Sequence, residues 1–505
     1  PAPLLPAAAA AVAASAPLPA RAASSEGKTS VHLVRKIREA ARAGNTEQLR
    51  KLLRSGGDVN TREADSDSPS LYLACLKGHA ACTQLLLQAR AEVDGLTKEG
   101  LCALYASCQS GRAECVALLL AANAKVDLPN KKGSTPLYMA CLNGHLECAR
   151  SMVGARAAVD QLNSDGFTPL YAACETGKAE CVELLLSFGA APDLAAADGR
   201  TPLFASSKYG KASCVRLLLT AAADADVPMD DGTTPLAVAA ASGATECLRA
   251  LLGACASVDL ANEIGSTPLH EAARAGQEVC LSLLLEAGAA VDALNEDGAS
   301  PLYYAAEAGK PTCVQLLLRA NANVAGGDST ELGLGATARA EDDGRDDSSA
   351  TEPVLSESPL YAAASVGCAE SVRLLLAALA DVNEVSADGA SALFVAAQQG
   401  HADCALLLLG RGAHVDAPNG QGISPLYAAA HAGRCECVRT LLSSNAALDG
   451  AIGISHQQSA ISHQPSAIRR GLAGNTRAGA CERRRLDGAA RGRGVRREGA
   501  FENGT

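Results

Sequence analysis

Cysteine is the residue type whose number and spacing first suggest chemistry in this 505-residue chain, which contains 19 of them. Thiolates bind zinc and act as nucleophiles, so a regular series suggests a row of metal ligands. Ten cysteines recur at a spacing of about 33 residues, with one longer gap: Cys82, Cys115, Cys148, Cys181, Cys214, Cys247, Cys280, Cys313, Cys404 and Cys437. Ligands in successive repeats project in parallel rather than converging on a tetrahedron, whereas free Cys packs as a small hydrophobe. We therefore predict that this series is structural and that the chain has no metal site.

Other residues that suggest catalysis lack the partners it needs. The Gly-Lys-Thr at 27–29 resembles the end of a phosphate-binding loop, but the earlier Gly is absent and no buried strand precedes it. Serine-hydrolase and kinase signatures are missing. His79, His145 and His401 each follow a Gly that ends a predicted helix, which indicates a structural position. The sequence therefore predicts a non-enzymatic protein with no catalytic residues and no cofactor.

Composition and net charge limit which functions and cellular locations the chain can have. Hydrophobic residues make up 48% of the chain, charged residues 20% and aromatics 3%, and the net charge is −11. An acidic average argues against a nucleic-acid-binding body, because phosphate contacts need a concentrated basic face. A chain this long does not need disulfides to stabilise a core, so we expect reduced thiols and a cytoplasmic or nuclear location. The long uncharged run at 1–20 carries five prolines and is a poor membrane helix.

The elements that must position these residues belong to an internal repeat. A Thr-Pro-Leu triplet begins at each of Thr135, Thr168, Thr201, Thr234 and Thr267. Weaker copies centre on Leu71, Leu104, Leu302, Leu360, Leu393 and Leu426.

Each copy predicts two helices and a turn. Thr caps a helix start and Pro suits its first position, so the first helix begins at the triplet. It ends at a Gly such as Gly177, and a second helix with apolar residues at helical spacing follows over 180–186. Asp198-Gly199 then suits a tight hairpin turn.

This arrangement closely resembles the ankyrin-repeat family, which implies an all-α repeat solenoid with projecting β-hairpin loops. We assign 31–324 to a degenerate first copy and eight further repeats, and 353–449 to three more. Tyr stands where the family usually has His, at Tyr138 and Tyr171 for example, which puts the usual His hydrogen bonds in doubt but not the fold.

Three segments fall outside the repeat. Residues 1–30 form an Ala/Pro-rich segment that we expect to be disordered, with a targeting leader as the alternative. Residues 325–352 are rich in Asp, Gly and Ser and predict a flexible acidic insertion. Residues 450–505 contain a near-duplication and Arg-rich pieces, and predict a disordered basic tail.

The family resemblance implies that partners bind hairpin tips and the outward side of the first helices, which line a concave face. None of the matching early residues has an obvious core to fill, and together they mix apolar and basic side chains. They are Leu76, Lys77, Lys98, Leu101, Lys131, Lys132, Leu142, Phe167, Arg200, Lys208 and Tyr209. Later copies carry acidic residues instead: Asp230, Asp231, Glu263, Glu296, Asp297 and Glu307.

Three functions fit the sequence. The first is a scaffold or adaptor that binds a protein partner on the concave surface, without membrane contact. A second is a substrate-recruiting subunit of a modifying enzyme such as a ubiquitin ligase. A third is nucleic-acid binding through the Arg-rich tail, which salt-sensitive binding would reveal. The sequence names neither the partner nor the oligomeric state.

Overall fold

The computed structural model describes residues 27–61, 68–325 and 357–447. The chain divides into unit 1, Pro1–Asn323, and unit 2, Val324–Thr505. The predicted tail, most of the acidic insertion and the first 26 residues lie outside the described ranges.

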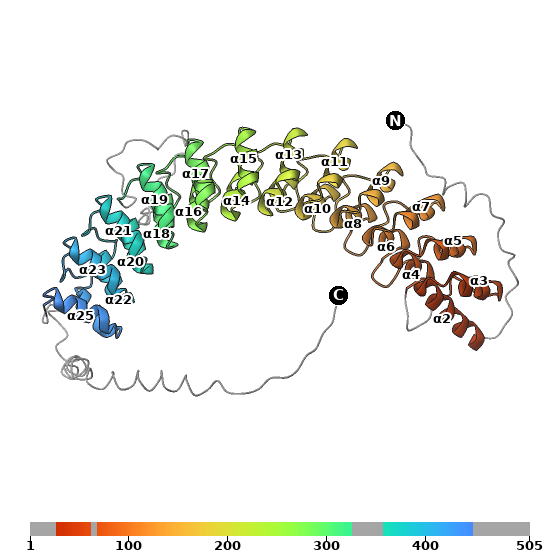
Figure 1. The fold of residues 1–505 in the computed structure, drawn as a ribbon, viewed down its shortest axis with the longest axis horizontal. Coiled ribbons are helices and arrows are strands. Elements are labelled where there is room, and N and C mark those ends of the chain that lie inside the picture. The colour runs from red at the N-terminus through yellow and green to blue at the C-terminus, as the bar shows by residue number, and fades with distance from the viewer. Residues whose placement is uncertain (1–26, 62–67, 326–356, 448–505) are drawn as a thin grey trace, which may run out of the picture. The chain divides into compact units, whose positions relative to one another are not determined.

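Unit 1 consists of stacked helix pairs, in which even-numbered first helices and odd-numbered second helices form two rows (Figure 1). Its helices are α2 Gly27–Ala43, α3 Thr46–Arg54, α4 Ser70–Lys77, α5 Ala80–Gln88, α6 Ala103–Gln109, α7 Ala113–Ala121, α8 Pro136–Asn143, α9 Leu146–Gly154, α10 Pro169–Thr176, α11 Ala179–Ser187, α12 Pro202–Lys208, α13 Ala212–Thr220, α14 Pro235–Ser242, α15 Thr245–Gly253, α16 Pro268–Ala275, α17 Glu278–Glu286, α18 Pro301–Glu307 and α19 Pro311–Arg319. Helix α2 begins inside the segment that composition assigns to the leader.

Unit 2 repeats the same plan three times. Its helices are α20 Pro359–Val366, α21 Ala369–Ala377, α22 Ala392–Gln399, α23 Ala402–Gly410, α24 Pro425–His431 and α25 Cys435–Ser443. The predicted all-α repeat solenoid is confirmed.

Local signals start and stop these helices as the sequence predicts. The Thr135 hydroxyl accepts a hydrogen bond from the Tyr138 N–H at 3.2 Å, which satisfies an amide that has no partner inside the helix. Gly144 ends α8 with φ +75°, a conformation that costs glycine little. His270 adds the reciprocal bond, because its Nδ1 accepts from the Thr267 N–H at 3.1 Å. Tyr138 has no such acceptor, so the Tyr copies keep only half of this cap.

A second set of hydrogen bonds fixes neighbouring repeats to one another. After each second helix an Asp or Asn side chain accepts from a backbone N–H of the next repeat, and Asp160 to Ala191 at 3.1 Å is one example. The same bond joins Asp94 to Lys125, Asp127 to Ala158, Asp193 to Asp224, Asp226 to Ser257, Asp259 to Ala290, Asp292 to Asn323, Asn383 to His414 and Asp416 to Ala447. Each of these bonds ties the backbone of one repeat to a side chain of the preceding repeat, mostly at exposed positions.

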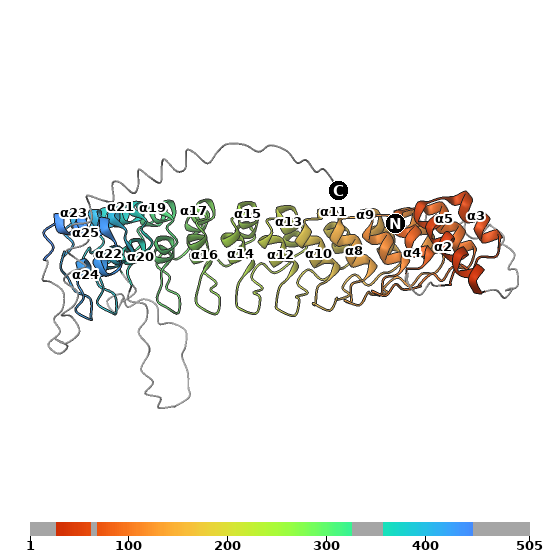
Figure 2. The ribbon, with the colours of Figure 1, turned by 90° about the horizontal axis from the view of Figure 1, so that it is seen from below.

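The loops that precede the first helices project to one side of the helix rows of unit 1 (Figure 2). Each loop closes through two backbone hydrogen bonds. In one example, the Gly166 N–H donates to the Asn163 carbonyl at 3.0 Å, and the Asn163 N–H donates to the Phe167 carbonyl at 3.1 Å. The predicted β-hairpin is therefore reduced to its turn. Among the described residues no strand forms, and the isolated antiparallel bridge Val385 to Ser391 is the one trace of pairing. Five-residue tips are too short for a ladder of strand hydrogen bonds.

Candidate functional site

The projecting turns of unit 1 make one continuous row, although they are far apart in the sequence. A Cβ added at Gly133 would lie 2.9 Å from the Ser164 backbone nitrogen, and one at Gly166 would lie 2.8 Å from that of Ala197. The Ser164 N–H also donates to the Lys132 carbonyl at 2.9 Å. The close approach recurs at every junction between the turns at 97–101, 130–134, 163–167, 196–200, 229–233, 262–266 and 295–299. The backbone hydrogen bond recurs from Asp230 to Asp198, from Glu263 to Asp231 and from Glu296 to Ile264. We call these seven turns the turn row.

Charge is distributed unevenly along the turn row. Lys98, Lys131 and Lys132 are exposed on its first two turns, where Glu99 is the one carboxylate. The last three turns carry exposed carboxylates and no basic residue: Asp230, Asp231, Glu263, Glu296 and Asp297. The sequence predicts this change of sign, and the stacking of the turns places it along one surface.

An aromatic junction lies between the two charged parts of the row. The rings of Phe167 and Tyr171 stack with centroids 4.3 Å apart and planes inclined by 18°. The Arg200 guanidinium lies 5.1 Å from the Phe167 centroid, within the range of a cation–π contact. Arg200 also pairs with Asp198 at 2.5 Å. Phe167 therefore packs against Tyr171 of its own repeat and against Arg200 of the next turn, contrary to the prediction that it has no obvious core to fill.

The tyrosines behind the row are not acid–base groups near neutral pH. Burial raises the pKa of Tyr171 to about 12, and Arg200 partly opposes this effect. Burial also raises the pKa of Tyr138 to about 12, with further increases from Glu175 and Asp165. Both phenols therefore stay protonated, which favours packing rather than catalysis.

The other predicted residues lie at the ends of first helices. Lys208 and Tyr209 are exposed at the end of α12, with the ammonium 5.8 Å from the ring centroid. Lys77 is exposed at the end of α4, whereas Leu76 and Leu142 are half-buried. Of the predicted side chains, the structure records a ring contact between Arg200 and Phe167 and another between Lys208 and Tyr209.

The cysteine series is buried, as the sequence predicts. Burial raises the pKa of the Cys148 thiol to about 12 and those of Cys247, Cys313 and Cys404 to about 11. These four thiols stay protonated, and a protonated thiol is a poor nucleophile and a poor metal ligand. Three members of the series differ, because a hydrogen bond from a neighbouring buried cysteine lowers the pKa of Cys115, Cys181 and Cys214. Within the part of the chain that the structure describes, no cluster of three or more His, Cys, Asp or Glu is arranged to hold a metal ion.

The three histidines contact the preceding repeat. The Nε2 atom of His79 lies 3.2 Å from the Arg42 carbonyl oxygen, that of His145 lies 3.2 Å from Gln109, and that of His401 lies 3.0 Å from Ser365. The structural interpretation of these residues is confirmed.

Sequence reasoning missed three residues of this surface. Asp198 is the partner of Arg200, Tyr171 is the platform for Phe167, and Ile264 is 53% exposed on an acidic turn. The phase of the repeat could have found Ile264, because it directly precedes the turn glycine. The Phe167 to Tyr171 stacking had no signal in the sequence.

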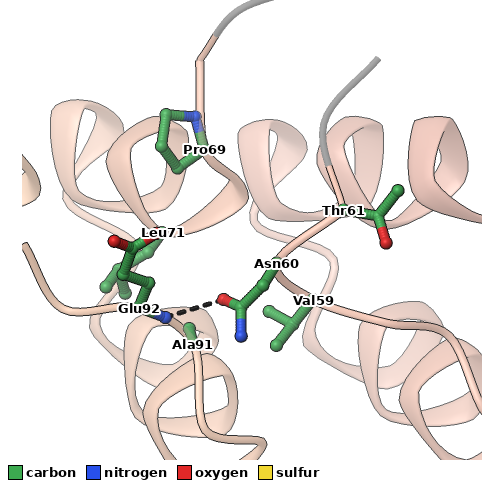
Figure 3. A pocket seen from close by; sticks show the side chains of 7 residues that line it. All are labelled: Val59, Asn60, Thr61, Pro69, Leu71, Ala91 and Glu92. Atoms are coloured by element: carbon green, nitrogen blue, oxygen red, sulfur yellow. Dashed lines mark hydrogen bonds between the residues drawn. The ribbon is translucent and has the colours of Figure 1, made fainter. Parts of the chain in front are cut away.

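A small pocket between the first two repeats carries no site (Figure 3). Asn60 spans it and accepts from the Glu92 N–H at 2.7 Å, as the first member of the Asp and Asn series that joins the repeats. The lining residues are Val59, Asn60, Thr61, Pro69, Leu71, Ala91 and Glu92. These side chains serve the junction between the repeats.

No helix among the described residues combines the length and the apolar character needed to cross a bilayer.

Comparison with known proteins extends these findings. A mouse protein, ankyrin repeat domain-containing protein 40, is 35% identical over 65 residues, which is 13% of this chain and 18% of the length of that relative. The crystal structure of the human ASB11 ankyrin repeat domain is similar at 32% identity, covering 43% of this chain and 96% of that one, with a TM-score of 0.40.

The family comparison covers much more of the chain. The family of ankyrin repeats in three copies matches residues 37–130, 122–196, 183–260, 254–326 and 360–451. These matches span more than half of the chain and coincide with the helix pairs of both units. The chain therefore belongs to the ankyrin-repeat family, whose repeats are protein–protein interaction modules.

Proposed function

We propose that this chain is a non-enzymatic scaffold or adaptor, and that it holds a protein partner against the early turns of the turn row and the neighbouring ends of the first helices. The observation that carries the proposal is the continuity of the row. It places exposed lysines of two adjacent turns beside the aromatic junction of the next two.

The side chains present are suited to binding a protein. Tyr209 is 44% exposed, and rigid aromatic and Arg side chains are the usual anchors of protein interfaces. The exposed lysines of the first two turns carry charge that can steer a partner and fix its register. The cysteine series is buried in the core, and the buried Tyr138 and Tyr171 stay protonated, so neither group supplies chemistry to this surface.

Affinity capture from native extract tests the proposal. The intact chain is compared with a variant carrying Lys131→Glu, Lys132→Glu and Tyr209→Glu, which change exposed side chains and leave the Phe167 packing in place. We expect the variant to lose a protein that the intact chain captures. The matched control carries Arg216→Glu, Arg249→Glu and Phe188→Glu, which likewise replace two cations and one aromatic ring by Glu, at exposed positions of the second-helix row.

Circular dichroism must show the same helicity in all three proteins. If the control variant also loses the partner, binding is not specific to the turn row. If both variants retain the partner, the proposed surface is refuted.

The two alternative functions remain hypotheses. Deletion of residues 471–505 tests nucleic-acid binding by the tail, and an enzyme that co-purifies stoichiometrically would favour the recruiting subunit.

A further inference from the structure

The turn row has one sign of charge at each end. Lys98, Lys131 and Lys132 form a basic block on the first two turns, which Glu99 reduces in part. Asp230, Asp231, Glu263, Glu296 and Asp297 form an acidic block on the last three. The turns at 163–167 and 196–200 separate the blocks. Asp198 and Arg200 neutralise each other there, and Asp165 adds one exposed carboxylate.

The blocks do not neutralise each other. Other ion pairs in the described part of the chain, such as Arg150 to Glu147 and Arg274 to Glu271, join residues three apart on a single helix. No residue of either block takes part in an ion pair there. Exposed like charges on adjacent turns create a local field of one sign, which favours a ligand of the opposite sign.

The acidic block also offers apolar contact. Ile264 is 53% exposed between Glu263 and the turn glycine. Long basic side chains lay their methylene stems along apolar surface while the charged end stays in water. Lys or Arg of a ligand therefore suits this block in shape as well as in charge.

We propose that the turn row binds an extended segment of a protein partner that is bipolar. Its carboxylates lie over the basic block and its Lys or Arg side chains lie over the acidic block. This inference rests on the proposed function and specifies the chemistry of the partner.

The repeat spacing sets the distance between the two ends of such a segment. The turns at 130–134 and 229–233 are three repeats apart, and helices pack at roughly 8 to 10 Å, so the blocks are separated by about 25 to 30 Å. An extended chain rises about 3.3 Å per residue, so about eight to ten residues must join the acidic and basic parts.

Synthetic peptides test the proposal on the full chain. The probe is a fluorescein-labelled peptide with four Glu, a spacer of twelve uncharged residues, which leaves slack, and four Arg. The control peptide has the same composition with Glu and Arg interleaved. We expect fluorescence anisotropy at low salt to give a Kd about tenfold lower for the bipolar peptide, because each end meets the opposite charge. The difference should shrink when salt shortens the Debye length.

Charge reversal localises the effect. Lys131→Glu with Lys132→Glu should abolish the preference for the bipolar peptide, and so should Asp230→Lys with Asp231→Lys. Arg216→Glu with Arg249→Glu, on the second helices, should leave it unchanged.

Equal affinities for the two peptides would overturn the inference. So would a preference that survives both reversals, or tighter binding of single-stranded DNA through the lysines than of the bipolar peptide. If the capture experiment succeeds while the peptides bind equally, the proposed function stands and the bipolar partner does not. If the variant with Lys131→Glu, Lys132→Glu and Tyr209→Glu still captures the partner, the proposed function itself fails.

Discussion

The core between repeats and the turn row follow the same sequence period. The residue type is kept from repeat to repeat in the core, whereas it changes from turn to turn along the row. Leu137, Leu170 and Leu203 occupy one core position in successive repeats, and each is completely buried. The residue before the turn glycine instead changes from Lys132 to Asp165 and later to Ile264. Packing constrains the first position, whereas the second faces solvent and the turn tolerates any side chain there. The comparison teaches that the fold is encoded in the residues that repeat, whereas the residues that do not repeat give each turn its own surface chemistry.

One core position departs from this rule. It holds Cys75, Cys108, Cys141 and Cys174 in early first helices, and Ala240, Ala273 and Ala306 in later ones. Ser207 stands between the two groups, and its buried hydroxyl is the one side-chain N or O atom without a hydrogen-bond partner in the described ranges. At this position the residue type changes from Cys to Ser to Ala, and no hydrogen bond stabilises the buried Ser207 hydroxyl.

The largest expected effect breaks the core. Leu170→Ala should lower the free energy of unfolding by about 2 to 5 kcal/mol, because it removes buried methyl groups and leaves a cavity. Urea denaturation followed by circular dichroism measures it. Leu162→Ala is the control, because Leu162 is 41% exposed. Similar losses in the two variants would mean that the core position is no more constrained than the surface.

Two Gly→Ala variants, with a smaller expected loss of stability, distinguish the cost of crowding between turns from the cost of a positive φ. Gly166 and Gly189 both have positive φ, +80° and +83°, and a side chain there costs about 1 to 2 kcal/mol. A Cβ at Gly166 also meets the next turn, whereas a Cβ at Gly189 meets no atom within 4 Å. Gly166→Ala should therefore lower the melting temperature more than Gly189→Ala. Equal shifts would show that the turns of the row are not tightly packed.

The smallest expected change is a gain. Ser207→Ala should raise the free energy of unfolding by about 1 kcal/mol, because it removes a buried hydroxyl that has lost its water and has no partner. The neighbouring Ser206 is equally buried, but its hydroxyl donates to the Leu203 carbonyl at 3.0 Å. Ser206→Ala should therefore give no such gain in the same urea titration. A loss of stability in the Ser207 variant would mean that its hydroxyl is bonded in solution.

Much of the fold was predictable because its signals are local. Thr135 and Gly144 mark the two ends of α8 through capping and positive φ, which depend on a few neighbouring residues. The period of the cysteines predicts their burial. The hairpin prediction was wrong in detail, because each tip closes in five residues and the turns bond to other turns rather than to paired strands.

The candidate surface was predictable only as a set of positions. The period identifies Lys132, Phe167 and Arg200 as turn residues, since position within a repeat predicts which loop a residue lies in. Lys132 is exposed as expected, whereas Phe167 and Arg200 are half-buried.

By itself, the sequence determined the repeat, the helix ends and the buried positions, because each depends on residues within one copy. Only the tertiary structure decided that the turns form one continuous row and that Phe167 stacks on Tyr171 while Arg200 makes a cation–π contact with its ring. It also decided that the buried Ser207 hydroxyl has no hydrogen-bond partner. The continuity of the row and the contact between Phe167 and Arg200 depend on how one repeat packs against the next, and the partner of a buried hydroxyl depends on the surrounding fold. Distances across these junctions are set by the packing of whole helices rather than by any local run of residues.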